Sequence, residues 1–288
     1  MFSPSSAPLP PQSHWSGQAK RRSGMDAAQG VHSVWGSALL KPELPLTIGR
    51  LRLAHLPLFV VVGCVGLFSV CYTLAVQAGH ARATLPMVSD CLRRAPESYL
   101  AGWGMITFAC IGLLCLVLAT AGYLCRFESP CAADGRLRAA VVFFGVLACE
   151  GFGVVGIVTE RDNNALHVAG ALTGFFAYYV HAVALTGALY RSRAEGATTT
   201  ASLVCKAFST SLGLIALVVF GFLIASGAED PSIGGTVGDR EVAACEWVAL
   251  VAMGVFMMSL RLEFGSELQV QDVWPAAARG LWALPQGG

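Results

Sequence analysis

The sequence predicts an all-α fold: a polytopic membrane bundle of six transmembrane helices with both termini in the cytosol. Two observations support this prediction. The chain contains six long apolar runs, and charged residues make up only 13% of its 288 residues, about half of their usual share in soluble domains. A helix needs about 20 predominantly apolar residues to cross the hydrocarbon core of a bilayer. The net charge of +1 gives no reason to expect nucleic acid as a partner.

Each apolar run is long enough, or nearly long enough, to form one transmembrane helix. Four of the runs contain no Asp, Glu, Lys or Arg, whereas the third contains only Glu150 and the sixth only Glu246. No soluble core of this size needs six such runs. The predicted spans are residues 58–78, 98–125, 139–159, 165–190, 207–228 and 242–260, and together they define a transmembrane domain over residues 55–265.

The two ends of the chain are predicted to lie outside the bundle. Residues 1–54 are rich in Ser, Pro and Gly, and such a segment cannot bury enough apolar surface to offset the entropy lost on ordering. We therefore expect a disordered cytosolic N-terminal tail. The first span is expected to act as an uncleaved signal anchor, because the tail lacks the pattern of a signal peptide. Residues 266–288 are predicted to form a cytosolic C-terminal tail.

The distribution of basic residues predicts the orientation. Fourteen Lys and Arg residues lie in the tails and in the loops on the same side as the tails, and five lie in the loops on the opposite side. Because short cytosolic loops of membrane proteins are enriched in Lys and Arg, both termini are predicted to be cytosolic. The loops on the opposite side also carry eight acidic residues, so the predicted outer or lumenal face is acidic.

Polar residues gather at the predicted outer ends of the spans. Carboxylates and an imidazole at this depth are costly unless they are paired, protonated or hydrated, and they usually have a role. The group comprises three residues of the first outer loop, two at the end of the third span, one on the fourth and one on the sixth: Ser89, Asp90, Glu97, Thr159, Glu160, His167 and Glu246.

Two interpretations of this cluster remain open. The functional one is a metal site, a lipid-headgroup site or an acid–base pair for lipid chemistry. The structural one is a clamp in which His167 and Glu246 hydrogen-bond and fix how the fourth and sixth spans pack. We favour the clamp, because the ligand spacing of a known metal motif is missing. We therefore expect no metal and no cofactor, and the sequence identifies no catalytic residue.

The third and fourth spans carry an acid and several glycines. Glu150 lies midway along the third span, and we expect it to be protonated and hydrogen-bonded to a neighbouring helix, with His181 as a candidate partner. The five residues between the two spans make them antiparallel neighbours. Small residues let helices approach closely in a membrane. The glycines expected at this contact are Gly151, Gly153, Gly156, Gly170 and Gly174.

Several short motifs occur in a fixed order on these spans. They are Pro-x-x-Ser-Asp at residues 86–90, Pro-Glu at 96–97, the glycine-rich stretch 151–156 followed by His167, and Glu-Trp at 246–247. Over residues 55–265, the chain resembles the six-span family of damage-regulated autophagy modulators (DRAM). That family includes Frag/Sfk-type proteins and the GPI-anchor lipid-remodelling factor. The chain departs from the family at residues 92–94, which read Leu-Arg-Arg where small polar residues are commoner.

The resemblance implies a multi-pass regulatory or scaffold protein that acts in autophagy and lipid organisation. Its expected partners are membrane lipids and cytosolic proteins bound through the tails, as in relatives linked with phosphoinositide-kinase recruitment. Its expected location is an endomembrane (lysosome, Golgi or endoplasmic reticulum) or the plasma membrane. The alternative is a lipid-modifying enzyme or subunit, as in GPI-anchor remodelling, that uses the outer acids and His167.

The predicted topology can be tested with reporters fused to the chain. A reporter at Gly288 and one at the N-terminus should both be accessible from the cytosol, whereas one inserted at Gly234 should be lumenal or external, because basic residues hold their loops on the cytosolic side. Protease digestion of sealed vesicles provides the measurement. Protection of either terminus from cytosolic protease would contradict the six-span topology.

Overall fold

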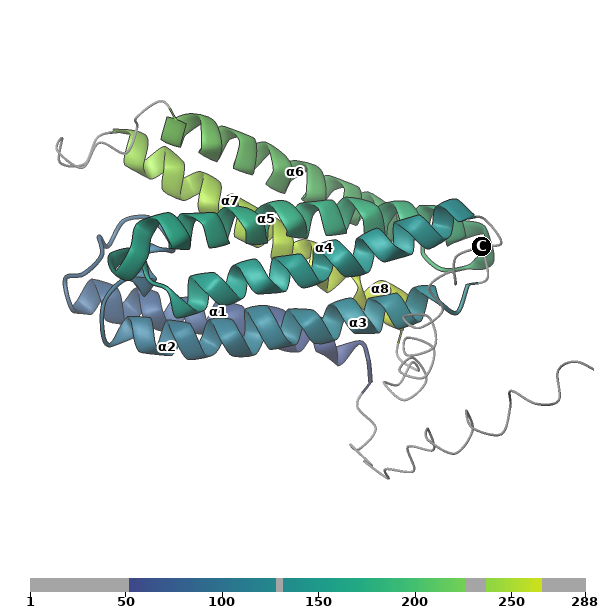
Figure 1. The fold of residues 1–288 in the computed structure, drawn as a ribbon, viewed down its shortest axis with the longest axis horizontal. Helices are drawn as coiled ribbons and strands as arrows, with labels where there is room; N and C mark the ends of the chain where they lie inside the picture. The colour runs from purple at the N-terminus through teal and green to yellow at the C-terminus, as the bar shows by residue number, and fades with distance from the viewer. Residues whose placement is uncertain (1–51, 128–131, 226–236, 266–288) are drawn as a thin grey trace, which may run out of the picture. The chain divides into compact units, whose positions relative to one another are not determined.

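The computed structural model describes residues 52–127, 132–225 and 237–265, and this part of the chain is helical with no strand. Six of its helical segments are long and apolar enough to cross a membrane, so the predicted all-α bundle of six spans is confirmed. Figure 1 shows the arrangement of these helices, in which α4 lies beside α5, α6 beside α7, and α1 beside α2. The predicted tails lie outside the described residues, apart from 52–54.

The first two spans are α1 and a composite of three helical segments. In the second span, α2 continues through the π-helical segment η2 into α3, without a break in the helical path. The helical segments of the described chain are α1 (His55–Gln77), η1 (Asp90–Leu92), α2 (Glu97–Gly104), η2 (Met105–Gly112), α3 (Leu113–Leu124), α4 (Ala132–Ile157), α5 (Glu160–Arg191), η3 (Ser192–Glu195), α6 (Thr200–Ala225), α7 (Val237–Ser259) and α8 (Arg261–Phe264).

Several helices begin earlier than the apolar runs indicate, and α5 and α6 show why. α5 begins at Glu160 rather than at residue 165, because Thr159 and Asp162 form a capping box in which each side chain accepts a hydrogen bond from the other's backbone N–H. α6 begins at Thr200 rather than at residue 207, and it therefore includes Lys206. The Thr199 hydroxyl oxygen accepts from the backbone N–H of Ser202 at 3.2 Å, so a side-chain hydrogen bond supports the first turn of α6 as well, in polar sequence that hydropathy alone assigns to a loop.

The backbones of α4 and α5 approach each other closely at a pair of glycines. A Cβ atom added to Gly151 would lie 2.3 Å from the backbone nitrogen of Gly174, so only glycine fits there. Gly170 packs against Val154 of α4 in the same contact. The other two predicted glycines of α4 face the second span, with Gly156 against Gly102 and Met105, and Gly153 near Cys110.

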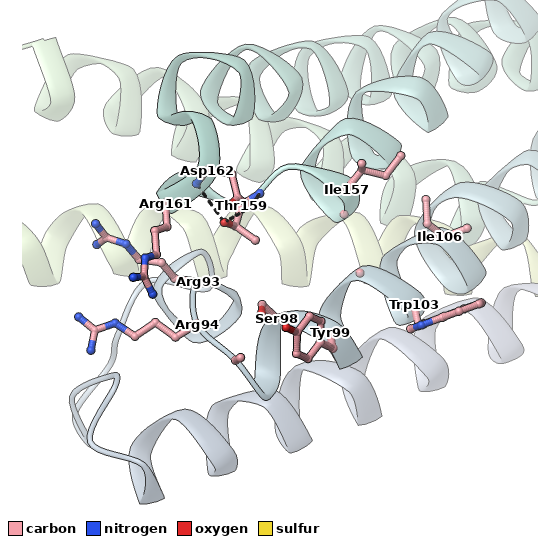
Figure 2. Close-up of a pocket in the computed structure, with 13 residues that line it drawn as sticks. Arg93, Arg94, Ser98, Tyr99, Trp103, Ile106, Ile157, Thr159, Arg161 and Asp162 are labelled. Carbon is pink, nitrogen blue, oxygen red and sulfur yellow. Dashed lines mark hydrogen bonds between the residues drawn. The ribbon is translucent and has the colours of Figure 1, made fainter.

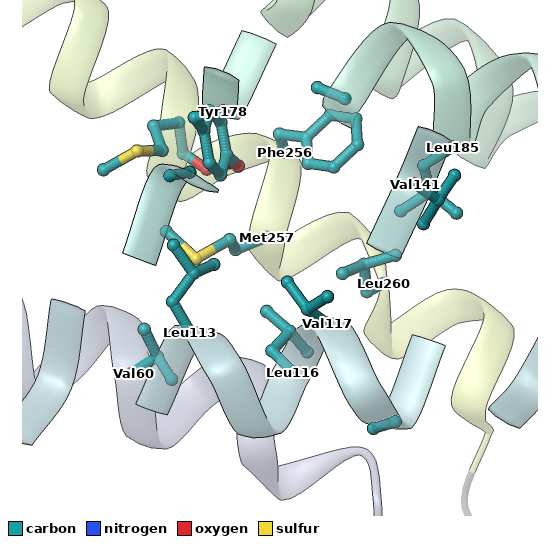
Figure 3. Close-up of a cluster of buried hydrophobic side chains, with 14 of the residues drawn as sticks. Val60, Leu113, Leu116, Val117, Val141, Tyr178, Leu185, Phe256, Met257 and Leu260 are labelled. Atoms are coloured by element: carbon teal, nitrogen blue, oxygen red, sulfur yellow. Dashed lines mark hydrogen bonds between the residues drawn. The ribbon is translucent and has the colours of Figure 1, made fainter. Parts of the chain in front are cut away.

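The core is built where α3, α5 and α7 meet. Figure 3 shows Leu113 and Val117 of α3, Tyr178 and Leu185 of α5, and Phe256 and Leu260 of α7 as parts of one buried cluster. Two adjacent tyrosines also tie α5 to α7, because the hydroxyl of Tyr178 donates to the Met253 carbonyl at 3.1 Å and that of Tyr179 to the Ala249 carbonyl at 2.7 Å. Polar ends of aromatic residues are thereby satisfied inside an apolar core.

The expected contact between Glu150 and His181 is not formed, which corrects the prediction. Nδ1 of His181 lies 2.7 Å from the Val141 carbonyl, and its ring packs against Gly145. Glu150 is exposed on the outside of the bundle. At 100° per residue, Glu150 lies about 140° around α4 from Gly145, so it cannot share the face that meets His181.

The glycine contact predicts different effects on stability for two similar substitutions in α4. Gly151→Ala should destabilise the protein by about 1–3 kcal/mol, because its methyl group would overlap the backbone of α5. Gly153→Ala is the matched control, since its Cβ would lie 3.7 Å from the Cys110 sulfur, an ordinary contact. Thermal unfolding of the purified protein in detergent measures both. Equal stability of the two variants would show that the α4 and α5 backbones do not touch.

Candidate functional site

The first loop, between α1 and α2, is held down by two consecutive residues of α7. The backbone N–H of Val88 donates to Oε2 of Glu246 at 2.7 Å, and the indole N–H of Trp247 donates to the Pro86 carbonyl at 2.9 Å. We call this pair of contacts the loop latch. It joins positions that are about 160 residues apart in the sequence, at the end of the bundle that the charge count predicts to be outer.

Apolar side chains of the loop pack beneath the latch. Val88 and Leu92 are buried, and they form a small cluster with Cys71 of α1 and Ala101 of α2, against which Trp247 also packs. The loop is therefore packed against the bundle as a layer of its own. Burial of these side chains supplies the stabilising free energy, and the latch fixes the loop's position.

A buried acid and a histidine meet beside the latch. Nδ1 of His80 lies 2.5 Å from Oε1 of Glu97, which is fully buried at the start of α2. The second carboxylate oxygen of Glu97 has no hydrogen-bond partner within the described chain. The sequence analysis missed His80. The available signal was that it is the one histidine of the predicted outer loops, in the same loop as Glu97.

The other members of the predicted cluster are spread along the same end. The Ser89 hydroxyl is buried and has no partner among the described residues. Arg93 lies between two carboxylates, with Asp90 and Glu160 each at 4.0 Å. Thr159 serves as the cap of α5. The structure thus brings Ser89, Asp90 and Glu246 together around the loop, and it places Thr159 and Glu160 at the α4–α5 turn.

His167 and Glu246 take different partners, which corrects the expected clamp between them. Nδ1 of His167 lies 2.7 Å from the Val158 carbonyl, and the side chain is buried. Side chains on a helix lean toward its N-terminus, so His167 reaches back to the turn that precedes α5. Glu246 instead accepts from the first loop. Each residue therefore fixes one connection between helices, and neither fixes the packing of α5 on α7.

Cys91 lies within this region and is chemically quiet. Burial, together with the nearby carboxylates of Asp90 and Glu246, raises the pKa of the Cys91 thiol to about 12. A thiol in such surroundings stays protonated at physiological pH, and the thiolate is the reactive form of cysteine. Cys91 therefore acts as a small buried apolar residue of the loop.

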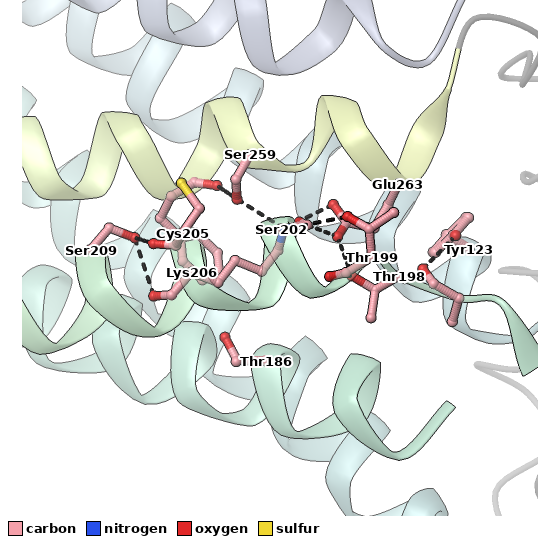
Figure 4. A network of polar contacts seen from close by, with 12 residues as sticks. Tyr123, Thr186, Thr198, Thr199, Ser202, Cys205, Lys206, Ser209, Ser259 and Glu263 are labelled. Atoms are coloured by element: carbon pink, nitrogen blue, oxygen red, sulfur yellow. Dashed lines mark hydrogen bonds and ion pairs between the residues drawn. The ribbon is translucent and has the colours of Figure 1, made fainter. Parts of the chain in front are cut away.

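A second polar centre lies at the opposite end of the bundle (Figure 4). Nζ of Lys206 on α6 forms a fully buried ion pair with Oε2 of Glu263 on α8 at 2.8 Å. Lys206 also donates to the hydroxyls of Ser202 and Ser259, and Oε1 of Glu263 accepts from Thr198 and Ser202. Every donor on the ammonium group is thereby used, which is the condition under which a buried charge is tolerated.

The sequence analysis did not identify this centre, because it assigned Lys206 to a loop. One available signal was the spacing of four residues between Ser202 and Lys206, which places the two side chains on one face of a helix. The hydroxyl of Tyr123 on α3 also donates to the Ala197 carbonyl at 2.8 Å. The network therefore connects α3, α6, α7 and α8 at the predicted cytosolic end.

An apolar groove of about 900 Å³ runs between α1 and α7. Its α1 wall extends from Val61 to Thr73 and its α7 wall from Trp247 to Ser259, and Leu262 of α8 lines it beyond the end of α7. Leu85 and Pro86 of the first loop line it as well, so the latch residue Trp247 contacts both the loop and the groove. Among the described residues, no three His, Cys, Asp or Glu side chains come together as metal ligands would.

These features define a helical membrane protein of six spans with a structured first loop. The chain belongs to the Frag1/DRAM/Sfk1/Cwh43P N-terminal domain family, whose family model matches residues 52–267. The match covers all six spans and includes the four residues of the latch.

Three relatives illustrate the similarity. The chain is 27% identical over 146 residues to human DNA damage-regulated autophagy modulator protein 1, covering 49% of this chain and 59% of that protein. It is 31% identical over 128 residues to the zebrafish modulator of macroautophagy TMEM150B, covering 43% and 52%. It is 24% identical over 229 residues to the Xenopus laevis DNA damage-regulated autophagy modulator protein 1, covering 75% and 93%.

The match to the human protein thus spans little more than half of that relative's length. No solved structure matches the chain.

The separate partners of Glu246 and His167 predict additive effects. Glu246→Gln should be tolerated, because its amide oxygen can still accept from Val88, whereas Glu246→Ala should cost about 1–3 kcal/mol by leaving that N–H unpaired. His167→Ala should cost a similar amount, because the Val158 carbonyl would lose its hydrogen-bond partner. In the double Ala variant the two losses should add to within about 0.5 kcal/mol in thermal unfolding. If the double variant is no less stable than either single variant, the two side chains are in direct contact and the prediction is wrong.

Proposed function

We propose that this chain is a membrane-embedded modulator of autophagy that acts by binding a bilayer lipid in the groove between α1 and α7. The observation that carries this proposal is the groove, which lies beside the structured first loop. The regulatory part of the proposal draws on the relatives, whose names describe modulators of autophagy.

The dimensions of the groove suit a lipid hydrocarbon chain. From Trp247 to Ser259 its α7 wall covers 12 residue steps, which corresponds to about 18 Å of helix. One leaflet of hydrocarbon is about 15 Å thick, half of the bilayer core. An acyl chain can therefore lie along the groove over its full depth in the leaflet.

The surface chemistry of the groove also suits hydrocarbon. The hydroxyls of Ser69 and Thr73 donate to backbone carbonyls of their own helix, and that of Tyr72 donates to the Ala83 carbonyl, so none of these donors needs a polar ligand. Three methionines of α7, at positions 253, 257 and 258, add flexible side chains. Methionine adapts its shape to irregular apolar partners, which favours lipids of varied chain structure.

The latch gives a route by which a bound lipid could act as a signal. Trp247 lines the groove and also holds Pro86 of the first loop. A lipid that contacts the indole therefore contacts the residue on which the loop's position depends. In our proposal, lipid occupancy sets the position of the loop, and partners read that position. Cytosolic partners would bind the predicted tails, 1–54 and 266–288, whose structure lies almost entirely outside the described residues.

The lipid-modifying alternative has less support from the geometry of its candidate groups. Glu97 is fully buried, and His167 is 5% exposed and bonded to Val158. A general acid or base must come within hydrogen-bond reach of its substrate. Neither side chain is placed at a surface that a lipid headgroup could reach, so we propose regulation rather than catalysis.

The proposal predicts that filling the groove abolishes function without unfolding the protein. Gly254 lines the groove, and a Cβ there would lie 3.7 Å from Val61. Gly254→Leu should therefore occupy the groove with its own side chain. In cells that lack the endogenous protein, this variant should fail to restore autophagic flux, measured as lysosome-dependent turnover of a long-lived reporter. Its crosslinking to a photoactivatable fatty acid should fall at least severalfold.

Gly221→Leu on α6 is the matched control, because nothing lies within 4 Å of a Cβ at Gly221 and the residue is exposed. This variant should retain both flux and crosslinking. Both variants should elute from size-exclusion chromatography as the wild type does. Loss of flux in Gly254→Leu with undiminished crosslinking would contradict lipid binding as the mechanism, and full activity of Gly254→Leu would contradict a role for the groove.

A further inference from the structure

A separate pocket of about 570 Å³ lies at the predicted outer end, between the second span and the α4–α5 turn. It shares no lining residue with the α1–α7 groove. Figure 2 shows its two different ends. The guanidinium groups of Arg93, Arg94 and Arg161 gather at one end, whereas Trp103 and Ile157 lie at the other, farther along the helices.

The arginine end has an excess of positive charge. All three arginines are exposed. Arg93 has two carboxylates only at the 4.0 Å limit of an ion pair, and within the described chain no salt bridge involves Arg94 or Arg161. Asp162 is the one acid among the lining residues, and its carboxylate already accepts from the Thr159 hydroxyl at 2.7 Å and from the Thr159 backbone. The planar donors of arginine match the oxygen atoms of a phosphate.

The other end has the character of a membrane interface. Tyr99 and Trp103 of α2 are 72% and 79% exposed, and Ile157 at the end of α4 is 71% exposed. Large residues with such exposure face the bilayer in a chain with six spans, and Tyr and Trp are enriched where headgroups meet hydrocarbon. Trp103 lies six residues into α2, about 9 Å below its start, so the pocket extends from the surface into the leaflet.

We propose that this pocket binds an anionic phospholipid of the leaflet that faces the first loop. Arg93, Arg94 and Arg161 surround its phosphate, while Trp103 and Ile157 contact the first part of its acyl chains. The order of the two ends along the helices matches the order of headgroup and hydrocarbon in a lipid. A free phosphate ion would use only the arginine end of the pocket.

The site can be tested on the full-length purified protein by native mass spectrometry. After delipidation, the protein should retain phosphatidylglycerol better than phosphatidylcholine. Arg94→Gln and Arg161→Gln should each reduce retention of phosphatidylglycerol by about fivefold, the usual effect of one basic residue near an anionic membrane surface. Arg240→Gln is the matched control. Arg240 is exposed at the predicted outer end of α7 and lies outside the pocket, and its substitution removes the same charge.

Two further arms identify the source of the phosphate. Trp103→Ala should also weaken phosphatidylglycerol retention, and added inorganic phosphate should not displace the lipid. Gly254→Leu, in the α1–α7 groove, should leave this retention unchanged, so this site and the proposed function can fail separately. The proposal is overturned if Arg240→Gln weakens retention as much as Arg161→Gln does. It is equally overturned if inorganic phosphate displaces the lipid and Trp103→Ala has no effect, since the site would then bind a free anion.

Discussion

The cost of leaving polar groups unpaired in or beside hydrocarbon governs how this bundle is assembled. An unpaired polar atom costs several kcal/mol where water is absent, so most buried polar side chains find a partner within the protein, with the Ser89 hydroxyl, the Thr210 hydroxyl and one Glu97 oxygen as exceptions among the described residues. Glu246 accepts a hydrogen bond from the backbone of the first loop, and the Tyr179 hydroxyl donates to a backbone carbonyl of α7. Lys206 forms an ion pair with Glu263. Each of these bonds connects different elements of the chain. Apolar packing brings the helices together, and these polar pairs decide which helix faces which.

The same constraint explains why the first loop is structured. Backbone groups of residues 86–88 lie against the end of α7, where they need partners other than water. Neighbouring side chains of α7 supply an acceptor and a donor, and the buried apolar residues of the loop fill the space beneath. Because Trp247 also lines the α1–α7 groove, the loop and the groove share a wall. A ligand in the groove would therefore touch the loop at Leu85 and Pro86 as well as the Trp247 side chain that holds it.

The sequence was sufficient to predict the six spans, since length and apolar composition follow directly from bilayer thickness. It was not sufficient for the partners of His167 and Glu246. Both bond to backbone groups, Val158 and Val88, whose positions depend on the folding of a turn and a loop. Lys206 was missed because hydropathy counts any lysine against a span, whether or not an acid neutralises it. Predicting which side of the bundle Glu150 faces requires knowing how α4 is rotated about its own axis, and sequence spacing alone does not give that rotation.

The two ends of the bundle use their charges differently, and this difference indicates where a charged ligand can bind. At the predicted cytosolic end, Lys206 and Glu263 neutralise each other and are fully buried, so neither offers a charge to another molecule. At the predicted outer end, Arg94 and Arg161 are exposed beside a pocket with an apolar, membrane-facing side. Two of the three residues that depart from the family resemblance, Arg93 and Arg94, thus line the basic pocket. Charges that neutralise each other inside the fold stabilise the helix packing, whereas exposed charges beside a surface pocket can bind a ligand.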